Sequence, residues 1–333
     1  IGKLSGNFQD YQLTVERNHL SSPTDVMEWL SLCIPDRSIQ FITENPGEIV
    51  FRISIPKDVQ WYRDPEINEH LGKMGREIQD LALFYHWGRG RNGYPSYFWS
   101  FNHCWALHSF SLHWPELRSL SKLTVIHLDA HEDLERLPFS FNPRSATFSS
   151  VCCDQIFKLG ELASTSSAIS YGLVGIGSFM LPLFAAVPSV DFIHVVPNEL
   201  LRSKSDRSLF IKTEYDGMLL KTERSEGPSH RYFPLGIHSV CPSNISTPIL
   251  LDIDLDFFCN ALDDRLAGFH TSSDQAVYAA IERTARLIRH TTWFINVIGI
   301  SVALSPGFFP ARLWSTSLSI LEEELFTQGY DKD

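Results

Sequence analysis

The chain has 333 residues, of which 44% are hydrophobic and 20% charged, and this is an ordinary composition for a globular protein. That length is enough for one large α/β domain or for two small domains. The formal net charge of -11 excludes the basic surface that phosphate contacts need, so no nucleic-acid partner is expected and a cationic substrate fits better. No apolar run reaches the roughly 18 residues of a membrane span, so no membrane partner is expected.

The cysteine pattern indicates reduced thiols and a cytoplasmic location. The sequence has six cysteines and no pair with the CxxC spacing. Adjacent cysteines bridge only under strain, and disulfides are rare in the cytosol. The first residues contain no apolar signal-peptide core either. The six are Cys33, Cys104, Cys152, Cys153, Cys241 and Cys259.

The first part of the chain gives local signals without a recognisable motif. Ser22-Pro23-Thr24-Asp25 is typical of a helix start and predicts a helix over Val26–Cys33. Ile39–Ile42 and Ile49–Ile55 predict short strands. Gly88–Gly93 is rich in turn residues and is interpreted as a surface turn. We interpret residues 1–95 as an N-terminal elaboration whose role the sequence does not specify.

From Tyr97 onward, apolar strands alternate with helices. Such alternation predicts a three-layer α/β/α fold with a mostly parallel sheet, and we expect one domain over residues 1–333 with a metal-binding core over 97–310. Ser272 and Gln275 fit a capping box for the predicted helix Asp274–His290. The predicted strands are Tyr97–Trp99, Leu123–Leu128, Ile169–Ile176, Val190–Val196, Ile249–Phe258 and Phe294–Leu304, and the predicted helices are Trp105–Trp114, Asp274–His290 and Leu313–Phe326.

Two acidic clusters coincide with the ends of predicted strands, where ligands bind in parallel sheets. Asp129, His131 and Asp133 follow the strand Leu123–Leu128 at every second position, so in extended chain they share one face. The other cluster lies in the predicted strand Ile249–Phe258. Its three acids, Asp252, Asp254 and Asp256, alternate with aliphatic residues.

Burying several carboxylates together is costly unless cations compensate them. An alternative is a solvated edge strand or a calcium loop at Asp252–Asp256. Apolar flanks argue against an exposed edge, and a calcium loop needs Gly and polar residues where Ile253 and Leu255 stand. The two clusters together therefore predict a metal site. His127 and His194 lie inside apolar strands and are interpreted as hydrogen-bonded core histidines.

The paired motifs resemble those of the ureohydrolase-like branch of the arginase/deacetylase family. Asp-Ala-His-x-Asp follows one strand and Asp-x-Asp ends a later one, and the resemblance covers roughly Tyr97 to Pro310. The longer motifs Leu-Asp-Ala-His-x-Asp-Leu and Leu-Asp-Ile-Asp-Leu-Asp-Phe-Phe and the late Ser-Pro-Gly are similar to a divergent arginase-like subfamily. That subfamily includes peptide arginases, which convert arginine side chains of ribosomally made precursor peptides to ornithine.

The resemblance implies two Mn²⁺ ions and six protein ligands. One ion would take His103, Asp129, Asp133 and Asp252, and the other would take His131, Asp129, Asp252 and Asp254. His103 stands in Ser-Phe-Asn-His, where the family has Gly-Gly-Asp-His. A hydroxide that bridges the two ions would attack the guanidinium carbon of an arginine within a precursor peptide and release urea.

The sequence departs from arginases at two functional positions. The late strand that carries their guanidinium-anchoring Glu has no carboxylate over residues 299–306, so Asp256 or Glu132 would have to serve. The loop over residues 134–150 has no proton-shuttle His, and His270 is the substitute that we consider. Motifs for the α-amino and α-carboxylate groups of a free amino acid are also missing. This favours a side chain within a longer peptide.

Three other functions remain open at the level of sequence. One is hydrolysis of a small guanidine such as arginine or agmatine. Another is amide deacetylation with a single zinc ion, against which the additional Asp133 and His103 argue. The last is a metal-stabilised binding protein without turnover. The oligomeric state is not specified by any pattern in the chain.

Overall fold

The protein is described by a computed structural model that covers residues 2–17, 22–56, 60–88, 95–201, 204–214, 219–224, 230–240, 244–262 and 273–327. Its largest element is a nine-stranded sheet in the order β13-β12-β14-β11-β7-β15-β16-β6-β5. The six strands from β14 to β6 pair in parallel, and β13, β12 and β5 add antiparallel edges. The predicted α/β class with a mostly parallel sheet is confirmed.

The strands of this sheet are short, and the central ones are buried on both faces. They are β5 (Tyr85–Gly88), β6 (Ser96–Ser100), β7 (Leu123–Leu128), β11 (Val190–Val195), β12 (Arg207–Glu214), β13 (Leu219–Arg224), β14 (His230–Leu235), β15 (Ile249–Asp254) and β16 (Val297–Ala303). All six residues of β7 and of β15 are buried. Such near-continuous apolar runs are expected where helices cover both faces of a parallel sheet.

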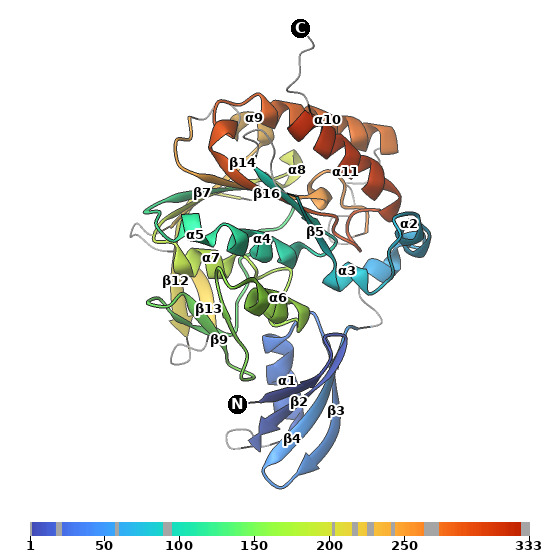
Figure 1. The fold of residues 1–333 in the computed structure, drawn as a ribbon, viewed down its shortest axis with the longest axis vertical. Helices are drawn as coiled ribbons and strands as arrows, with labels where there is room; N and C mark the ends of the chain where they lie inside the picture. The colour runs from blue at the N-terminus through green and yellow to red at the C-terminus, as the bar shows by residue number, and fades with distance from the viewer. Residues whose placement is uncertain are drawn as a thin grey trace.

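Helices cover the two faces of the sheet, as Figure 1 shows. One face carries α4 (Ala106–Leu112), α5 (Trp114–Leu117) and α7 (Leu181–Ala186), and the other carries α9 (Ile237–Val240), α10 (Asp274–Arg289) and α11 (Trp314–Glu322). Side chains of β7 alternate between two hydrophobic cores. Leu123 and Val125 enter the core on the α4 side, and Ile126 and Leu128 enter the core on the α10 side. The remaining helices are α2 (Ile67–Lys73), α3 (Asp80–Leu83), α6 (Leu162–Ser170) and α8 (Asn198–Leu201).

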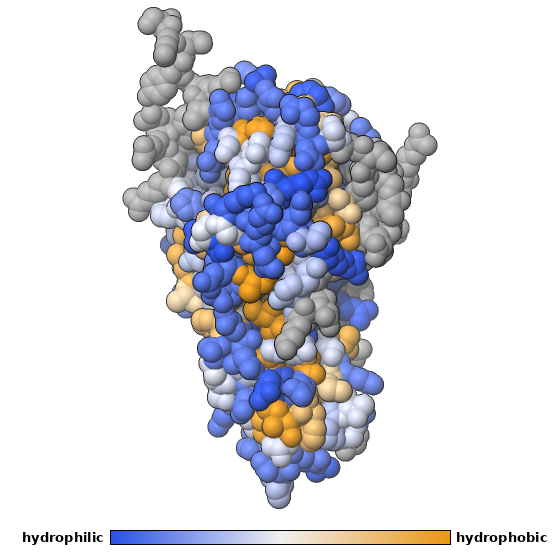
Figure 2. Space-filling model, turned by 90° about the vertical axis from the view of Figure 1, so that its right-hand side faces the viewer, coloured by the Kyte–Doolittle hydropathy of each residue, from blue (hydrophilic) through white to orange (hydrophobic). Residues whose placement is uncertain are grey.

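The N-terminal module, which we define as residues 3–54, has a sheet of its own (Figure 1). Its strands β1 (Lys3–Gly6), β2 (Asp10–Glu16), β3 (Ser38–Asn45) and β4 (Glu48–Ser54) form an antiparallel sheet in the order β1-β2-β4-β3, and α1 (Pro23–Cys33) packs with it. Alternate residues of β2 and β4 are buried, so one face of this sheet packs into the core on the α4 side. Figure 2 shows a mainly hydrophilic side of the molecule, with a hydrophobic patch over this module at the lower end.

A three-stranded antiparallel sheet lies between β7 and β11 in sequence, and no pattern predicted it. It contains β8 (Phe139–Asn142), β9 (Thr147–Ser150) and β10 (Ile156–Lys158). The rings of Phe148 and Phe157 stack with centroids 4.6 Å apart. Directly after β9, the carbonyl of Cys152 accepts a hydrogen bond from the amide of Gly2 at 3.1 Å. The start of the chain is thereby attached to this sheet.

Several predicted elements differ from the structure. The predicted strand Ile169–Ile176 is wrong, because Ile169 belongs to helix α6 and an irregular segment follows it. The predicted strand Phe294–Leu304 begins with a short 3-10 helix, Phe294–Asn296, and Ile249–Phe258 ends as a strand at Asp254. The N-cap of α10 is Ser273, whose hydroxyl accepts the amide of Ala276. Ser272 and the turn at 89–94 lie outside the described residues.

Two expectations from composition can be compared with the described residues. Within the part of the chain that is described, no helix is both long and apolar enough to cross a membrane. Five cysteines are described as unpaired and buried, while Cys241 lies outside the described ranges.

Candidate metal centre

A row of polar side chains crosses the middle of the large sheet. The parallel registers place His194 beside His127, His127 beside Asp252, and Asp252 beside Ser301. Side chains alternate along a strand, so these residues share the α4 face with their apolar neighbours two positions earlier, such as Val125. The row therefore lies inside the sheet layer close to the carboxyl ends of four strands, where parallel sheets form sites.

Two loops add donors above this row. His103 begins a short 3-10 helix after β6, and the side chain of Asn102 caps that helix by accepting the amide of Cys104 at 3.2 Å. The segment Asp129–Asp133 leaves the end of β7, and Asp133 has a positive φ of 52°. The predicted extended geometry of this segment is therefore wrong, because β7 ends at Leu128 and the turn itself brings the acidic side chains together.

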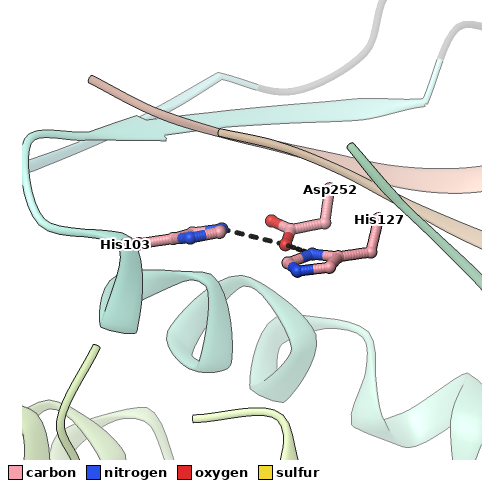
Figure 3. A group of neighbouring side chains, drawn as sticks. All are labelled: His103, His127 and Asp252. Carbon is pink, nitrogen blue, oxygen red and sulfur yellow. Dashed lines mark hydrogen bonds and ion pairs between the residues drawn. The ribbon is translucent and has the colours of Figure 1, made fainter. Parts of the chain in front are cut away.

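His103 stands at the centre of the first group of donors. Its Nε2 lies 2.9 Å from Asp252 Oδ2, and Figure 3 shows this carboxylate between the rings of His103 and His127. The opposite ring nitrogen, Nδ1, faces three further carboxylates. Their Oδ2 atoms lie 3.2 Å away in Asp129, 3.1 Å away in Asp133 and 2.9 Å away in Asp254.

A second group lies around His131. The Nδ1 atom of His131 lies 3.0 Å from Asp256 Oδ2 and 3.4 Å from Asp129 Oδ1. Asp256 lies in the short 3-10 helix Leu255–Phe257 that follows β15, and it accepts hydrogen bonds from the amide of Ala130 and the side chain of Asn260, both at 3.3 Å. Asp129 thus presents one oxygen to each group, which is the geometry of a carboxylate that is shared between two sites.

The charge of the two groups favours a bound cation. Five carboxylates lie within them, and none is more than 8% exposed: Asp129, Asp133, Asp252, Asp254 and Asp256. Burial would lower the pKa of His103, but Asp252, Asp254, Asp129 and Asp133 raise it well above its usual range. Burial and then the charge of Asp129 raise the pKa of Asp133 to about 7. Carboxylates held this close resist ionisation together unless a positive charge compensates them.

Unsatisfied polar atoms show that the residues fit a divalent cation. Asp129 Oδ2 and Asp133 Oδ2 are buried and have no hydrogen-bond partner among the described residues. Both face Nδ1 of His103. A buried carboxylate oxygen without a partner is costly. Carboxylate and imidazole donors that converge in this way form a set that divalent transition ions bind.

Hydroxyl groups of two serines hold the carboxylates of the later strand, and no sequence motif predicts either serine as a functional residue. Ser301 donates a hydrogen bond to Asp252 Oδ1, and Ser305 donates one to Asp254 Oδ2 at 2.5 Å. Ser305 has a positive φ of 45° in the Ser-Pro-Gly turn. These contacts orient the carboxylates: Asp252 keeps Oδ2 directed toward His103 and His127, and Asp254 presents the same Oδ2 to His103 that Ser305 bonds.

A cavity of about 730 Å³ opens onto the two groups. His103, Asp133, Asp254 and Asp256 line its inner part, and His131, whose side chain is 33% exposed, also faces it. The N-terminal module contributes to the wall through Asp36 and Arg37, among others. Two segments far apart in sequence therefore form one cavity above the acidic cluster.

Glu132 also lines this cavity but already has cationic partners. Its carboxylate accepts hydrogen bonds from the ammonium group of Lys204 at 2.8 Å and from the guanidinium group of Arg207. The hydroxyl of Tyr232 donates a third hydrogen bond to it at 3.1 Å. Burial would raise the pKa of Glu132, but Arg207 and Lys204 lower it to about 2. Its charge is therefore balanced within the protein.

The structure brings together all six residues predicted as metal ligands: His103, Asp129, His131, Asp133, Asp252 and Asp254. Asp256, predicted to contact substrate, lies beside His131. His270 lies outside the described residues. His127 was interpreted as a hydrogen-bonded core histidine, and it does bond Asp252 at 2.8 Å, but it also belongs to the cluster. Its position two residues before Asp129 was the signal that could have revealed it.

No family model matches the chain, and no curated protein matches it. Among solved structures, an arginase from Bacillus cereus overlaps with 82% of this chain and 77% of its own, at 15% sequence identity and a TM-score of 0.30. An overlap at this level does not by itself establish a family.

Proposed function

We propose that this protein is a binuclear metal-dependent hydrolase that converts peptidyl arginine to ornithine with release of urea. The observation that carries the proposal is the pair of His–Asp groups that share Asp129 and line a cavity. The sequence motifs at the same residues resemble those of arginases. Two Mn²⁺ ions are the proposed cofactors, because carboxylate oxygens predominate among the donors.

The ions, when bound, would lower the pKa of a water molecule and so supply a nucleophile at neutral pH. The protein contributes orientation. Ser301 and Ser305 fix the carboxylates of Asp252 and Asp254, and Asp256 fixes the ring of His131. Side chains whose rotamers are locked in this way keep catalytic geometry constant.

A cationic substrate fits the charge of the cavity. Its lining includes the carboxylates of Asp36 and Glu135 in addition to those of the metal groups. We propose that Asp256 contacts the guanidinium group, because Glu132, the other carboxylate considered for this role, already balances Lys204 and Arg207. A carboxylate and a guanidinium group form strong charge-assisted hydrogen bonds.

The size of the cavity supports an arginine within a peptide. Its volume of about 730 Å³ lies in the upper part of the range for ligand pockets and exceeds what one arginine side chain fills. Part of the wall comes from the N-terminal module through Asp36 and Arg37. Residues that flank the modified arginine would occupy this outer part of the cavity.

The test is a comparison of peptide and free amino acid. The Mn²⁺-loaded protein is incubated with free arginine and, separately, with arginine-containing peptides, and mass spectrometry follows the conversion to ornithine while a colorimetric assay follows urea. We expect conversion in peptides and far less in free arginine. The Asp252→Asn variant is the matched control and should be inactive because the site loses a buried carboxylate. If the loaded wild-type protein converts neither substrate, the proposed function is wrong.

A further inference from the structure

Two neighbouring histidines in the polar row have different surroundings. His194 uses both ring nitrogens, since Nδ1 lies 2.8 Å from the hydroxyl of Tyr232 and Nε2 lies 3.0 Å from the carbonyl oxygen of Asp129. His127 uses one, because Nδ1 bonds Asp252 while Nε2 is buried without a hydrogen-bond partner among the described residues. His194 is thus a satisfied core histidine, and His127 has one nitrogen that the fold leaves unused.

The unused nitrogen of His127 faces the unused oxygens of the first metal group. Nε2 lies 3.2 Å from Asp129 Oδ2 and 3.9 Å from Asp133 Oδ2, and neither oxygen has a hydrogen-bond partner among the described residues. His103 Nδ1 approaches the same two oxygens from the other side. Two ring nitrogens and two carboxylate oxygens therefore converge, and the side chain of His127 is fully buried among them.

We propose that His127 is a direct ligand of the first metal ion through Nε2, a role that no sequence motif assigns to it. The proposal rests on the proposed metal-dependent function, since it concerns the same ion. With the ring neutral, Nδ1–H donates to Asp252 and the lone pair of Nε2 is directed at Asp129 and Asp133. Metal-binding histidines usually have a carboxylate on the opposite ring nitrogen in this way. Asp252 thereby orients His127.

The position of His127 inside β7 makes such a ligand rigid. All six residues of the strand are buried, and its neighbours β11 and β15 hold it on both sides. His103 and His127 have nearly parallel rings with centroids 5.6 Å apart, and the carboxylate of Asp252 lies between them in Figure 3. The resulting donor set of His103, His127, Asp129 and Asp133 has two nitrogens and two oxygens, which are ligand types that divalent transition ions bind.

Two isosteric substitutions separate a ligand from a residue that only orients Asp252. The side-chain amide of Asn can take the place of Nδ1 and still donate to Asp252, but it leaves nothing at the position of Nε2. The amide of Gln reaches the position of Nε2 and loses the contact with Asp252. A direct ligand therefore predicts that His127→Asn is the more harmful change for metal binding, and an orienting role predicts the reverse order.

The readout is metal binding by the full chain. Calorimetric titration with Mn²⁺ should show at least about 100-fold weaker binding of one ion in His127→Asn and a smaller loss in His127→Gln. In Co²⁺-loaded protein, the visible absorption bands should shift in His127→Asn because a nitrogen donor is lost. His108→Asn is the matched control, because His108 is also a buried histidine but bonds Ser166 outside the cluster. It should bind both ions as the wild type does.

Circular dichroism of the metal-free variants serves to check that each one is folded. The metal-binding measurements on the folded variants then decide between the two roles of His127. Wild-type affinity and an unchanged Co²⁺ spectrum in folded His127→Asn would overturn the ligand role, and so would greater loss in His127→Gln. If His127→Asn lacks one ion while the loaded wild type converts no arginine, the ligand role stands and the proposed reaction fails. If neither variant folds, His127→Cys, which supplies a different metal-binding atom, replaces them, and a Co²⁺–thiolate charge-transfer band is then expected. Absence of that band would contradict the proposal.

Discussion

Among single residues, the candidate metal centre depends on carboxylates that each contact two histidine side chains. Asp129 presents Oδ2 to His103 and Oδ1 to His131, and Asp252 receives both His103 Nε2 and His127 Nδ1. A neutral hydrogen-bond network would not need five carboxylates in one buried volume. The excess of acceptors over donors is the reason that we assign cations to this place.

A histidine outside the site predicts how stability varies with pH. The Nδ1 atom of His230 accepts the amide of Val190 at 3.2 Å, and burial lowers the pKa of His230 to about 4. Between pH 6.5 and 4 the unfolded chain therefore binds a proton there that the folded chain does not, so stability falls as pH falls through this window. The contribution to the free energy of unfolding that is lost is about 3 kcal/mol.

The His230→Asn variant tests this contribution, because the Asn oxygen can accept the same amide and does not titrate in this range. Urea unfolding of chelator-treated protein at a series of pH values should show a weaker pH dependence in the variant, by about one proton between pH 6 and 4.5. Parallel curves for variant and wild type would contradict the assigned pKa shift.

The four carboxylates among the predicted metal ligands could be recognised from the sequence because acids in an apolar context are rare and costly, whereas His103 was assigned only through the resemblance to arginase motifs. His127 and His194 are both single histidines in apolar strands, and in the sequence only the spacing of His127 from Asp129 distinguishes them. The difference between them is set by neighbours on other strands, Asp252 for one and Tyr232 for the other. Serines such as Ser301 have no sequence signal at all, because serine is common in every environment.

At the scale of elements, the helix α10 provides a test of local structure. Ser273 caps it by accepting the amide of Ala276, so Ser273→Ala should lower the free energy of unfolding by about 1 kcal/mol. Chemical denaturation of the metal-free protein measures this change. Ser272→Ala is the matched control, because the capping box predicted from sequence would place the cap there. A larger loss in the control than in Ser273→Ala would contradict the capping geometry.

Helices and strands were predicted well where one hydrophobic pattern extends over the whole segment. The strand Leu123–Leu128 was predicted with the bounds of β7 because a short apolar run bounded by polar residues fits a strand that is buried on both faces. Ile169–Ile176 failed because its apolar residues belong partly to the buried side of α6. The edge strands β12 and β13 were not predicted, because their mixed polar sequences show no regular alternation.

At the scale of the whole molecule, the N-terminal module and the core are attached at the wall of the cavity. The guanidinium group of Arg37 donates to the carbonyls of Ser170 and Phe8, and Asp36 accepts the amide of Ile176 at 2.9 Å. The hydroxyl of Tyr11 donates to the carbonyl of Tyr171 at 2.6 Å. The segment that follows α6 lines the cavity, so these contacts fix part of the wall. The sequence could not predict this because docking depends on contacts across about 140 residues of chain.

Arg37→Ala is therefore expected to act on substrate binding and not on the metal ions. We predict that KM for an arginine peptide rises by about tenfold, equivalent to about 1.4 kcal/mol, while kcat and the metal content remain close to those of the wild type. Steady-state kinetics and elemental analysis measure these quantities. Arg52→Ala is the matched control, because Arg52 belongs to the same module and is half-exposed away from the cavity lining. An unchanged KM, or loss of metal, would contradict this role.

We propose that the two His–Asp groups hold two ions through a shared Asp129. The most direct test is the number of ions bound per chain, measured by equilibrium dialysis against Mn²⁺ followed by elemental analysis of the wild-type protein and of Asp129→Asn. We expect two ions per wild-type chain and at least about 100-fold weaker binding at both sites in folded Asp129→Asn. A wild-type chain that binds no ion, or an Asp129→Asn chain that keeps both with unchanged affinity, would contradict it.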